Sequence, residues 1–139
     1  MNTLEVWRPP NYVGGEYLNH ISVQLSPAGL SFQLENEKHE YEVLFNQIEF
    51  GNYVLSFRQL EDMKGTYLWK GTSAAREEFF GTSKSNWHLY KTSQSDYIKW
   101  FDTLPGPGSE SQSMTHYIIV TTESTFEILS TYEPELIVK

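Results

Sequence analysis

The side chains of this chain that could bind a metal or carry acid–base chemistry are scattered rather than grouped. Four histidines are present, and no two of them stand at a metal-ligand spacing such as H-x-x-x-H. Only His39 has carboxylates beside it, those of Glu40 and Glu42. On a strand, the two carboxylates project from one face and the imidazole from the other, so one metal ion cannot collect all three. The sequence predicts no metal site and no cofactor.

Motifs for nucleophilic catalysis and for phosphate binding are also missing. The segment Gly71 to Ala75, Gly-Thr-Ser-Ala-Ala, comes closest to a nucleophile elbow but lacks the last glycine. No P-loop or dinucleotide fingerprint occurs. Two carboxylates acting as acid and base in a cleft are an alternative that ranks last, and strongly perturbed pKa values in one pocket would be their signature. We therefore expect a protein that is not an enzyme.

The charge balance restricts the class of partner. The chain has 139 residues and a net charge of −8, from 18 acidic and 10 basic side chains. The basic residues are scattered singly, which disfavours binding to nucleic acids and to anionic membranes. The chain has no cysteine, no long apolar run and no basic, apolar leader at its start. These features predict a cytoplasmic protein and leave a basic protein as the partner that charge favours.

The sharpest surface feature is an acidic segment at residues 35–49. Glu40 and Glu42 are expected to project together from one face of a strand. Such a negative patch attracts a cationic partner and steers its approach. The alternative is an acidic edge that discourages sheet-to-sheet aggregation. Exposed aromatic rings serve as interface anchors, and Trp100 is the first candidate among the tryptophans. The predicted partner-binding residues are Glu35, Glu37, Glu40, Glu42, Glu49 and Trp100.

Hairpins of short strands supply the framework for this patch. Apolar and polar residues alternate through 21–35 on both sides of Pro27-Ala28-Gly29, which predicts a hairpin with one buried face. The same alternation in 40–58 places Tyr53, Leu55 and Phe57 on one face of a strand that follows a turn at Gly51-Asn52. A second hairpin is predicted at 117–132.

Helical signals are fewer. Ser93-x-x-Asp96 is a variant of the capping box and predicts a helix over about 94–104. Ser73 is a candidate cap for a shorter helix that ends at Phe80, and Tyr67 to Trp69 is a candidate short strand. The Pro-, Gly- and Ser-rich segment 105–114 is expected to be a mobile loop.

Together these signals predict a single domain over residues 1–139 of the α+β, mainly β class. Its antiparallel sheets are built from hairpins, with the 94–104 helix packed on a sheet. The profile is similar to that of small cytoplasmic proteins that neutralise bacterial toxins. The leading hypothesis is an acidic immunity or inhibitor protein that covers the active site of a basic toxin or effector. The alternatives are a small-molecule-binding β-barrel or sandwich and a subunit of a larger assembly.

Overall fold

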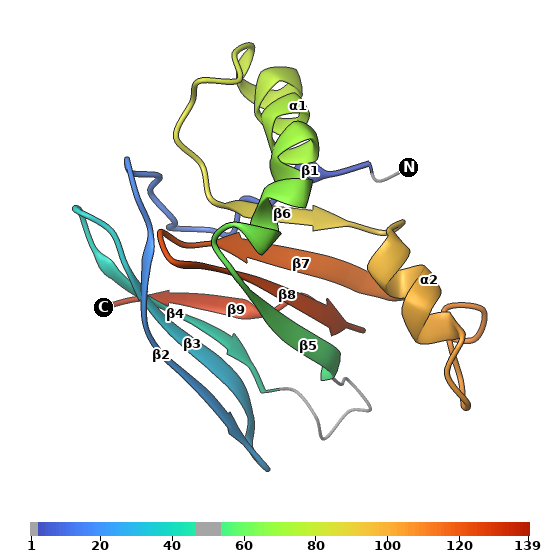
Figure 1. Cartoon of the computed structure of the whole chain (residues 1–139). Helices are drawn as coiled ribbons and strands as arrows, with labels where there is room; N and C mark the ends of the chain where they lie inside the picture. The colour runs from blue at the N-terminus through green and yellow to red at the C-terminus, as the bar shows by residue number, and fades with distance from the viewer. Residues whose placement is uncertain (1–2, 47–53) are drawn as a thin grey trace.

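A computed structural model describes residues 3–46 and 54–139 of the chain. The described residues form two antiparallel sheets and two α-helices, joined mainly by short connections (Figure 1). The predicted α+β, mainly β class is therefore confirmed. Gly51-Asn52, Tyr53 and Glu49 lie outside the described residues.

The first sheet has four strands in the order β2-β3-β4-β9. Their bounds are Asn19–Ser26 for β2, Gly29–Glu35 for β3, Glu40–Phe45 for β4 and Glu135–Val138 for β9. Strands β2 and β3 pair directly, which confirms the predicted hairpin at 21–35. The last strand returns from the far end of the chain to pair with β4.

The second sheet has five strands in the order β1-β6-β7-β8-β5. Their bounds are Glu5–Val6 for β1, Leu89–Thr92 for β6, Thr115–Val120 for β7, Ser124–Ser130 for β8 and Val54–Glu61 for β5. Strands β7 and β8 pair directly and confirm the predicted C-terminal hairpin.

The helices cover only one of the two sheets. A short 3₁₀ helix, η2 (Lys64–Leu68), leads into α1 (Trp69–Phe80), and α2 (Asp96–Asp102) precedes β7. Both α-helices pack on the outer face of the five-stranded sheet, so the layers run helices, five-stranded sheet, four-stranded sheet (Figure 1). Neither described α-helix is long and apolar enough to cross a lipid bilayer.

The main core lies between the two sheets. Tyr41, Val43 and Phe45 point inward from β4, and their neighbours Glu40 and Glu42 point outward, as the alternation predicts. Strand β8 differs because all of its residues are buried. It is covered by the other sheet on one face and by helices on the opposite face, which buries even its charged side chain.

Strand β5 does not place its side chains as the alternation predicts. Its pairing with β8 shifts register between Val54 and Ser56. After this bulge, Phe57 packs in the core between the sheets, whereas Leu55 packs under α2. The prediction that both share one face is therefore wrong. Arg58, the next residue along the strand, points to the face opposite Phe57, where its Nη2 donates to the Tyr67 hydroxyl of η2.

The region around α1 corrects two further predictions. Tyr67 to Trp69 is helical rather than a strand, and Ser73 lies inside α1 rather than at its start. The helix runs through Gly71, which packs closely on the N-terminal segment: a Cβ at this position would lie 2.8 Å from Leu4 Cδ1. Because this contact is non-local, local propensity does not reveal it.

Helix α2 is shorter than predicted and begins at a different cap. It spans Asp96–Asp102, and its N-cap is Ser95, whose Oγ accepts the backbone N–H of Ile98 at 3.2 Å. The predicted cap, Ser93, lies two residues earlier in the chain. The helix does pack on the sheet as expected, because Ile98 is buried against it.

The two serines give a matched test of this cap. Ser95→Ala should lower the free energy of unfolding by about 1–2 kcal/mol, because the cap hydrogen bond is lost together with the contact between Ser95 Oγ and His116 Nδ1. Ser93→Ala should change it by less than about 0.5 kcal/mol, since Ser93 is not the cap and no hydrogen bond of its side chain is found within the described residues. Urea unfolding of both variants measures the difference. Equal losses would contradict the assignment of Ser95 as the cap.

The segment 105–114 joins α2 to β7. Near its middle, the backbone N–H of Ser109 donates to Asp102 Oδ1 at 2.8 Å, so the loop folds back on the end of the helix. The Ser109 hydroxyl also donates to the Asp102 carboxylate, and these hydrogen bonds lower the pKa of that carboxyl. The mobility of this loop stays a prediction.

Candidate functional site

The outer face of the four-stranded sheet carries three of the six predicted partner-binding residues, Glu35, Glu40 and Glu42. Residues directly opposite in an antiparallel pair point to the same face. By this rule Glu35 of β3, Glu40 and Glu42 of β4 and Glu135 of β9 all project away from the core. We call this surface the acidic sheet face and define it by these four residues. Both α-helices lie on the other sheet, so no described helix covers it (Figure 1).

Two carboxylates of this face stand directly opposite each other. Glu35 and Glu40 are partners in the register of β3 and β4, at the ends of the strands that flank the turn. That turn is held by Asn36, whose Oδ1 accepts the backbone N–H groups of Lys38 and His39. Like charges that face each other across a sheet destabilise it. The register therefore concentrates negative charge and lowers the stability of the fold.

Glu42 is only partly available for a partner. Its Oε2 accepts the Ser31 hydroxyl at 2.7 Å, and its Oε1 lies 3.8 Å from Lys139 Nζ. The Lys139 ammonium also donates to Gln33 Oε1 at 2.9 Å. This lysine balances one of the four carboxylates, so the acidic sheet face keeps a net negative charge.

Glu37 does not join the acidic sheet face. Its Oε2 accepts the backbone N–H of Glu16 at 2.8 Å, and this hydrogen bond holds the pKa of the Glu37 carboxyl below its usual value. Next to it, Lys38 Nζ donates to the carbonyl oxygen of Gly14 at 2.9 Å. Both side chains thus fix the N-terminal loop. Glu49 lies outside the described residues.

A shallow hollow of about 410 Å³ lies at the edge of the acidic sheet face. Glu35 and Glu123 contribute two carboxylates to it, His20 contributes an imidazole, and no lysine or arginine is among the described residues that line it. Ile21 also lines the hollow and is 51% exposed. An aliphatic side chain beside two carboxylates suits the stem and the head group of a lysine or arginine. The hollow extends the acidic sheet face onto β2.

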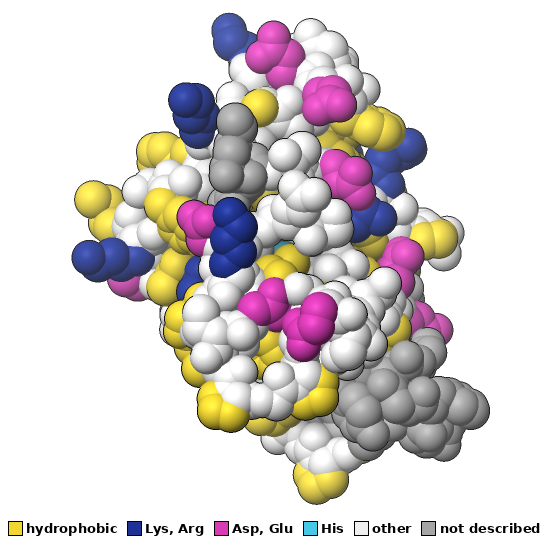
Figure 2. Space-filling view, turned by 90° about the vertical axis from the view of Figure 1, so that its right-hand side faces the viewer, with side chains coloured by type: hydrophobic (Ala, Val, Ile, Leu, Met, Phe, Trp, Pro, Cys, Tyr) yellow, Lys and Arg dark blue, Asp and Glu magenta, His cyan; other side chains and the backbone are white. Residues whose placement is uncertain are grey.

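Trp100 lies elsewhere on the molecule. It is half-exposed on α2, where its ring centroid is 5.8 Å from that of Tyr97. Since α2 packs on the far side of the five-stranded sheet, the structure does not bring Trp100 together with the acidic sheet face. Figure 2 shows this end of the molecule, where acidic and basic side chains are interspersed. Ile21 is the exposed apolar side chain next to Glu35 instead.

A buried polar network under the helices was not predicted. Its centre is Glu127 of β8, which is fully buried. The guanidinium of Arg58 donates to both carboxylate oxygens, from Nε at 2.9 Å and from Nη2 at 3.2 Å. The Tyr67 hydroxyl donates to Oε1 at 2.6 Å. The network therefore ties β8 to β5 and to η2.

The same carboxylate connects to α2 through a histidine. His116 Nε2 lies 2.8 Å from Glu127 Oε1, in a close electrostatic contact that is poorly aligned for a hydrogen bond. On the other side of the ring, His116 Nδ1 lies 2.8 Å from Ser95 Oγ. A neutral ring protonated at Nε2 fits both contacts, because Nδ1 then accepts the serine proton.

Serine, histidine and glutamate are the residue types of a nucleophilic triad. Here the Ser95 oxygen caps α2, and the side chain is only 3% exposed. The glutamate is also neutralised by Arg58. None of the pockets described here is lined by Ser95. We therefore interpret the network as a brace that fixes both helical segments to the sheet.

Electrostatics in this network favour the charged form of the glutamate. Burial by itself raises the pKa of Glu127, but the close contact with His116 and the hydrogen bonds from Arg58 and Tyr67 outweigh it and lower that pKa to about 2. Burial, and then the Glu127 carboxylate, raises the pKa of the Tyr67 hydroxyl. The sequence holds one signal for this site. Residues 117–120 are apolar on both faces of their strand, which predicts that the neighbouring strand of the hairpin, with Glu127, is also covered on both faces.

Within residues 3–46 and 54–139, no group of three or more His, Asp or Glu side chains is placed to hold a metal ion. The possible binding sites within the described residues are thus the acidic sheet face and the pockets beside α1. Comparison with known proteins finds no family model, no curated protein and no solved structure that matches this chain.

Proposed function

We propose that this protein is a non-catalytic immunity or inhibitor protein that binds a basic protein partner on the acidic sheet face. One observation carries the proposal: Glu35 and Glu40 are held directly opposite each other on a sheet face that no described helix covers. In the absence of a partner, this repulsion only lowers the stability of the fold. A cationic partner converts it into attraction, and stability given up in this way is common where a site serves binding.

The charge distribution also supports rapid association. The chain has a net charge of −8, and within the described residues Lys139 is the only cation at ion-pair distance from a carboxylate of the face. A field of one sign raises the rate of encounter with a partner of opposite sign. On a nuclease, for example, the carboxylates would occupy the positions of substrate phosphates or pair with lysine and arginine. The hollow with Ile21 would take one of these basic side chains.

Affinity capture from the source cell tests the proposal. Immobilised protein should retain one basic protein in stoichiometric amount at low salt, and the retained amount should fall at moderate salt because salt screens exposed charges. Mass spectrometry identifies the partner. Expression of that partner alone should then arrest growth, and co-expression of this chain should relieve the arrest. A partner that is acidic, or capture that salt does not weaken, would argue against binding on this face.

Neutralising Glu35 and Glu40 should have opposite effects on the stability of the fold and on binding of the partner. Glu35→Gln with Glu40→Gln should raise the free energy of unfolding by about 0.2–1 kcal/mol, the range for like charges facing each other on a sheet. The same variant should capture less of the basic partner at low salt. Urea unfolding and the capture assay measure the two effects. The matched control is Glu77→Gln with Glu78→Gln on the exposed face of α1, which removes the same charge and should leave capture unchanged.

A further inference from the structure

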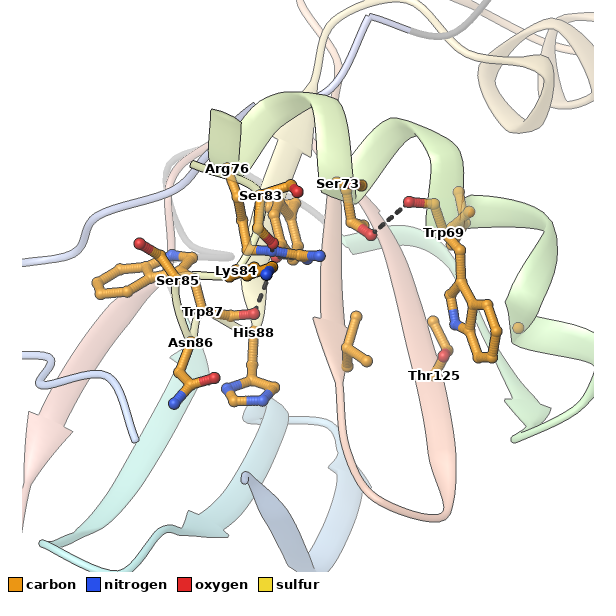
Figure 3. A pocket seen from close by; sticks show the side chains of 15 residues that line it. Trp69, Ser73, Arg76, Ser83, Lys84, Ser85, Asn86, Trp87, His88 and Thr125 are labelled. Carbon is orange, nitrogen blue, oxygen red and sulfur yellow. Dashed lines mark hydrogen bonds between the residues drawn. The ribbon is translucent and has the colours of Figure 1, made fainter. Parts of the chain in front are cut away.

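A second possible binding site lies on the helix-covered side of the molecule. It is a pocket of about 520 Å³ between α1, the loop of residues 81–88 and the neighbouring ends of the five-stranded sheet. Pockets of this size commonly take small molecules. Figure 3 shows Trp69 and Thr125 on one side of the pocket, and Arg76, Lys84 and His88 on the other.

The lining of this pocket has the opposite charge to the protein as a whole. Arg76 and Lys84 contribute two cations, and none of the described lining residues is acidic. Around them are hydroxyl groups that can donate to an anion, those of Ser73, Ser83, Ser85 and Thr125. The chain has a net charge of −8, so most of its surface repels anions, whereas this cationic, hydroxyl-lined pocket attracts them.

Arg76 is held in place by neutral groups only. Its Nε donates to the carbonyl oxygen of Ser83 at 2.9 Å, and its Nη1 donates to the Tyr90 hydroxyl at 2.7 Å. Tyr90 is fully buried and donates in turn to the carbonyl oxygen of Trp87 at 2.8 Å. These contacts use two of the five guanidinium N–H groups, so donors remain for a ligand.

The guanidinium of Arg76 has no counter-ion in the part of the chain that the structure describes. No carboxylate lies within ion-pair distance of it, whereas the other half-buried arginine, Arg58, is paired with Glu127. A partly buried charge without a partner is costly, and an arginine fork presents its donors in the geometry of a carboxylate or phosphate. The missing counter-ion is thus the group that a ligand would supply.

Two indole rings add a surface for a flat apolar group. Trp69 lines the pocket and is 63% exposed, so its ring is accessible to a ligand. Trp87 also lines the pocket, and its Nε1 donates to the carbonyl oxygen of Trp7 at 3.0 Å, which fixes the ring. A planar ring gains free energy by stacking on such indoles.

We propose that this pocket binds a small organic anion, with its carboxylate or phosphate group on Arg76 and Lys84 and a flat ring against Trp69. The site is separate from the acidic sheet face, because it lies on the outer side of the other sheet. Binding there does not depend on the proposed function, and either proposal can fail without the other.

The test uses NMR of the ¹⁵N-labelled full chain with four probes: benzoate, phenyl phosphate, inorganic phosphate and neutral benzamide. The reporters are the Nε–H signal of Arg76, assigned by its loss in Arg76→Lys, and the indole N–H signal of Trp69, assigned by its loss in Trp69→Phe. Benzoate or phenyl phosphate should shift both signals saturably. Benzamide should bind at least about tenfold more weakly, because it lacks the charge that the guanidinium recognises.

Variants then check the residues. Lys84→Gln and Trp69→Ala should each weaken binding of the anionic probe several-fold, and both positions are exposed, so the fold should tolerate the changes. The matched control is Lys70→Gln, an exposed cation of α1 outside the pocket, which should leave binding unchanged. Equal binding of benzamide and benzoate, equal binding of inorganic and phenyl phosphate, or no saturable shift of the Arg76 signal with any probe would overturn the proposal.

Discussion

Replacing Glu127 with glutamine should lower the free energy of unfolding by about 3–5 kcal/mol, the usual cost of removing one partner of a buried ion pair. The carboxylate accepts donors from Arg58 and Tyr67 and contacts His116, and it is fully buried. A carboxamide of the same size keeps one acceptor oxygen and turns an NH₂ group toward these donors. Urea unfolding at neutral pH measures the loss.

The matched control is Glu77→Gln, which makes the same chemical change on the exposed face of α1. It should alter the free energy of unfolding by less than about 0.5 kcal/mol. A loss below about 1 kcal/mol in Glu127→Gln would mean that the network contributes no more than an ordinary hydrogen bond, and the interpretation as a brace would be wrong.

The contribution of Glu127 should also depend on pH. Its pKa is lowered from 4.5 to about 2 in the folded protein, so the unfolded chain binds this proton more tightly. The stability that the carboxylate supplies is therefore present above about pH 4.5 and is lost as the pH falls toward 2. The linkage corresponds to about 3 kcal/mol. The difference between wild type and Glu127→Gln should shrink over this window, and a constant difference would contradict the lowered pKa.

Reversing two charges on the acidic sheet face should slow association with the basic partner. Glu40→Lys with Glu42→Lys replaces two outward carboxylates of β4 by ammonium groups. The association rate constant at low salt should fall by roughly 10–100-fold, because electrostatic steering is reversed. The effect should fade at high salt, where the Debye length is only a few ångströms. Surface plasmon resonance with the captured partner measures the association rate constant at low and at high salt.

The control for this experiment is Glu77→Lys with Glu78→Lys, which makes the same change in net charge on α1. Any effect of overall charge appears equally in both variants, so the difference between them isolates the acidic sheet face. If the two variants associate at the same rate at low salt, the partner does not approach through β3 and β4.

The alternation of apolar and polar residues predicts this fold well where one face of a sheet is exposed to solvent. In β4, Tyr41 and Val43 point inward while Glu40 and Glu42 point outward, so the predicted carboxylate pair is where the pattern placed it. The opposition of Glu35 and Glu40 follows from a hairpin with a four-residue turn, although the sequence pattern alone leaves the register open.

The remaining features depend on contacts between distant segments. Glu37 turns away from the acidic sheet face because it accepts a backbone N–H from Glu16, 21 residues earlier in the chain. Helix α1 runs through Gly71, and the absence of a side chain there lets the helix pack closely on Leu4. The network of Glu127 joins β5, β7, β8 and two helical segments, and no local pattern brings them together. The same reason explains why the pocket with Arg76 has no sequence motif.

Site-specific photo-crosslinking in the source cell tests the central claim most directly. A photoreactive phenylalanine derivative at Gln33 sits on the acidic sheet face, opposite Glu42 in the register of β3 and β4. The same derivative at Trp100 sits on α2, on the far side of the five-stranded sheet. We predict an adduct with one basic protein from position 33 and none from position 100. An adduct from position 100 alone, or with the same protein in equal yield from both positions, would contradict binding on the acidic sheet face.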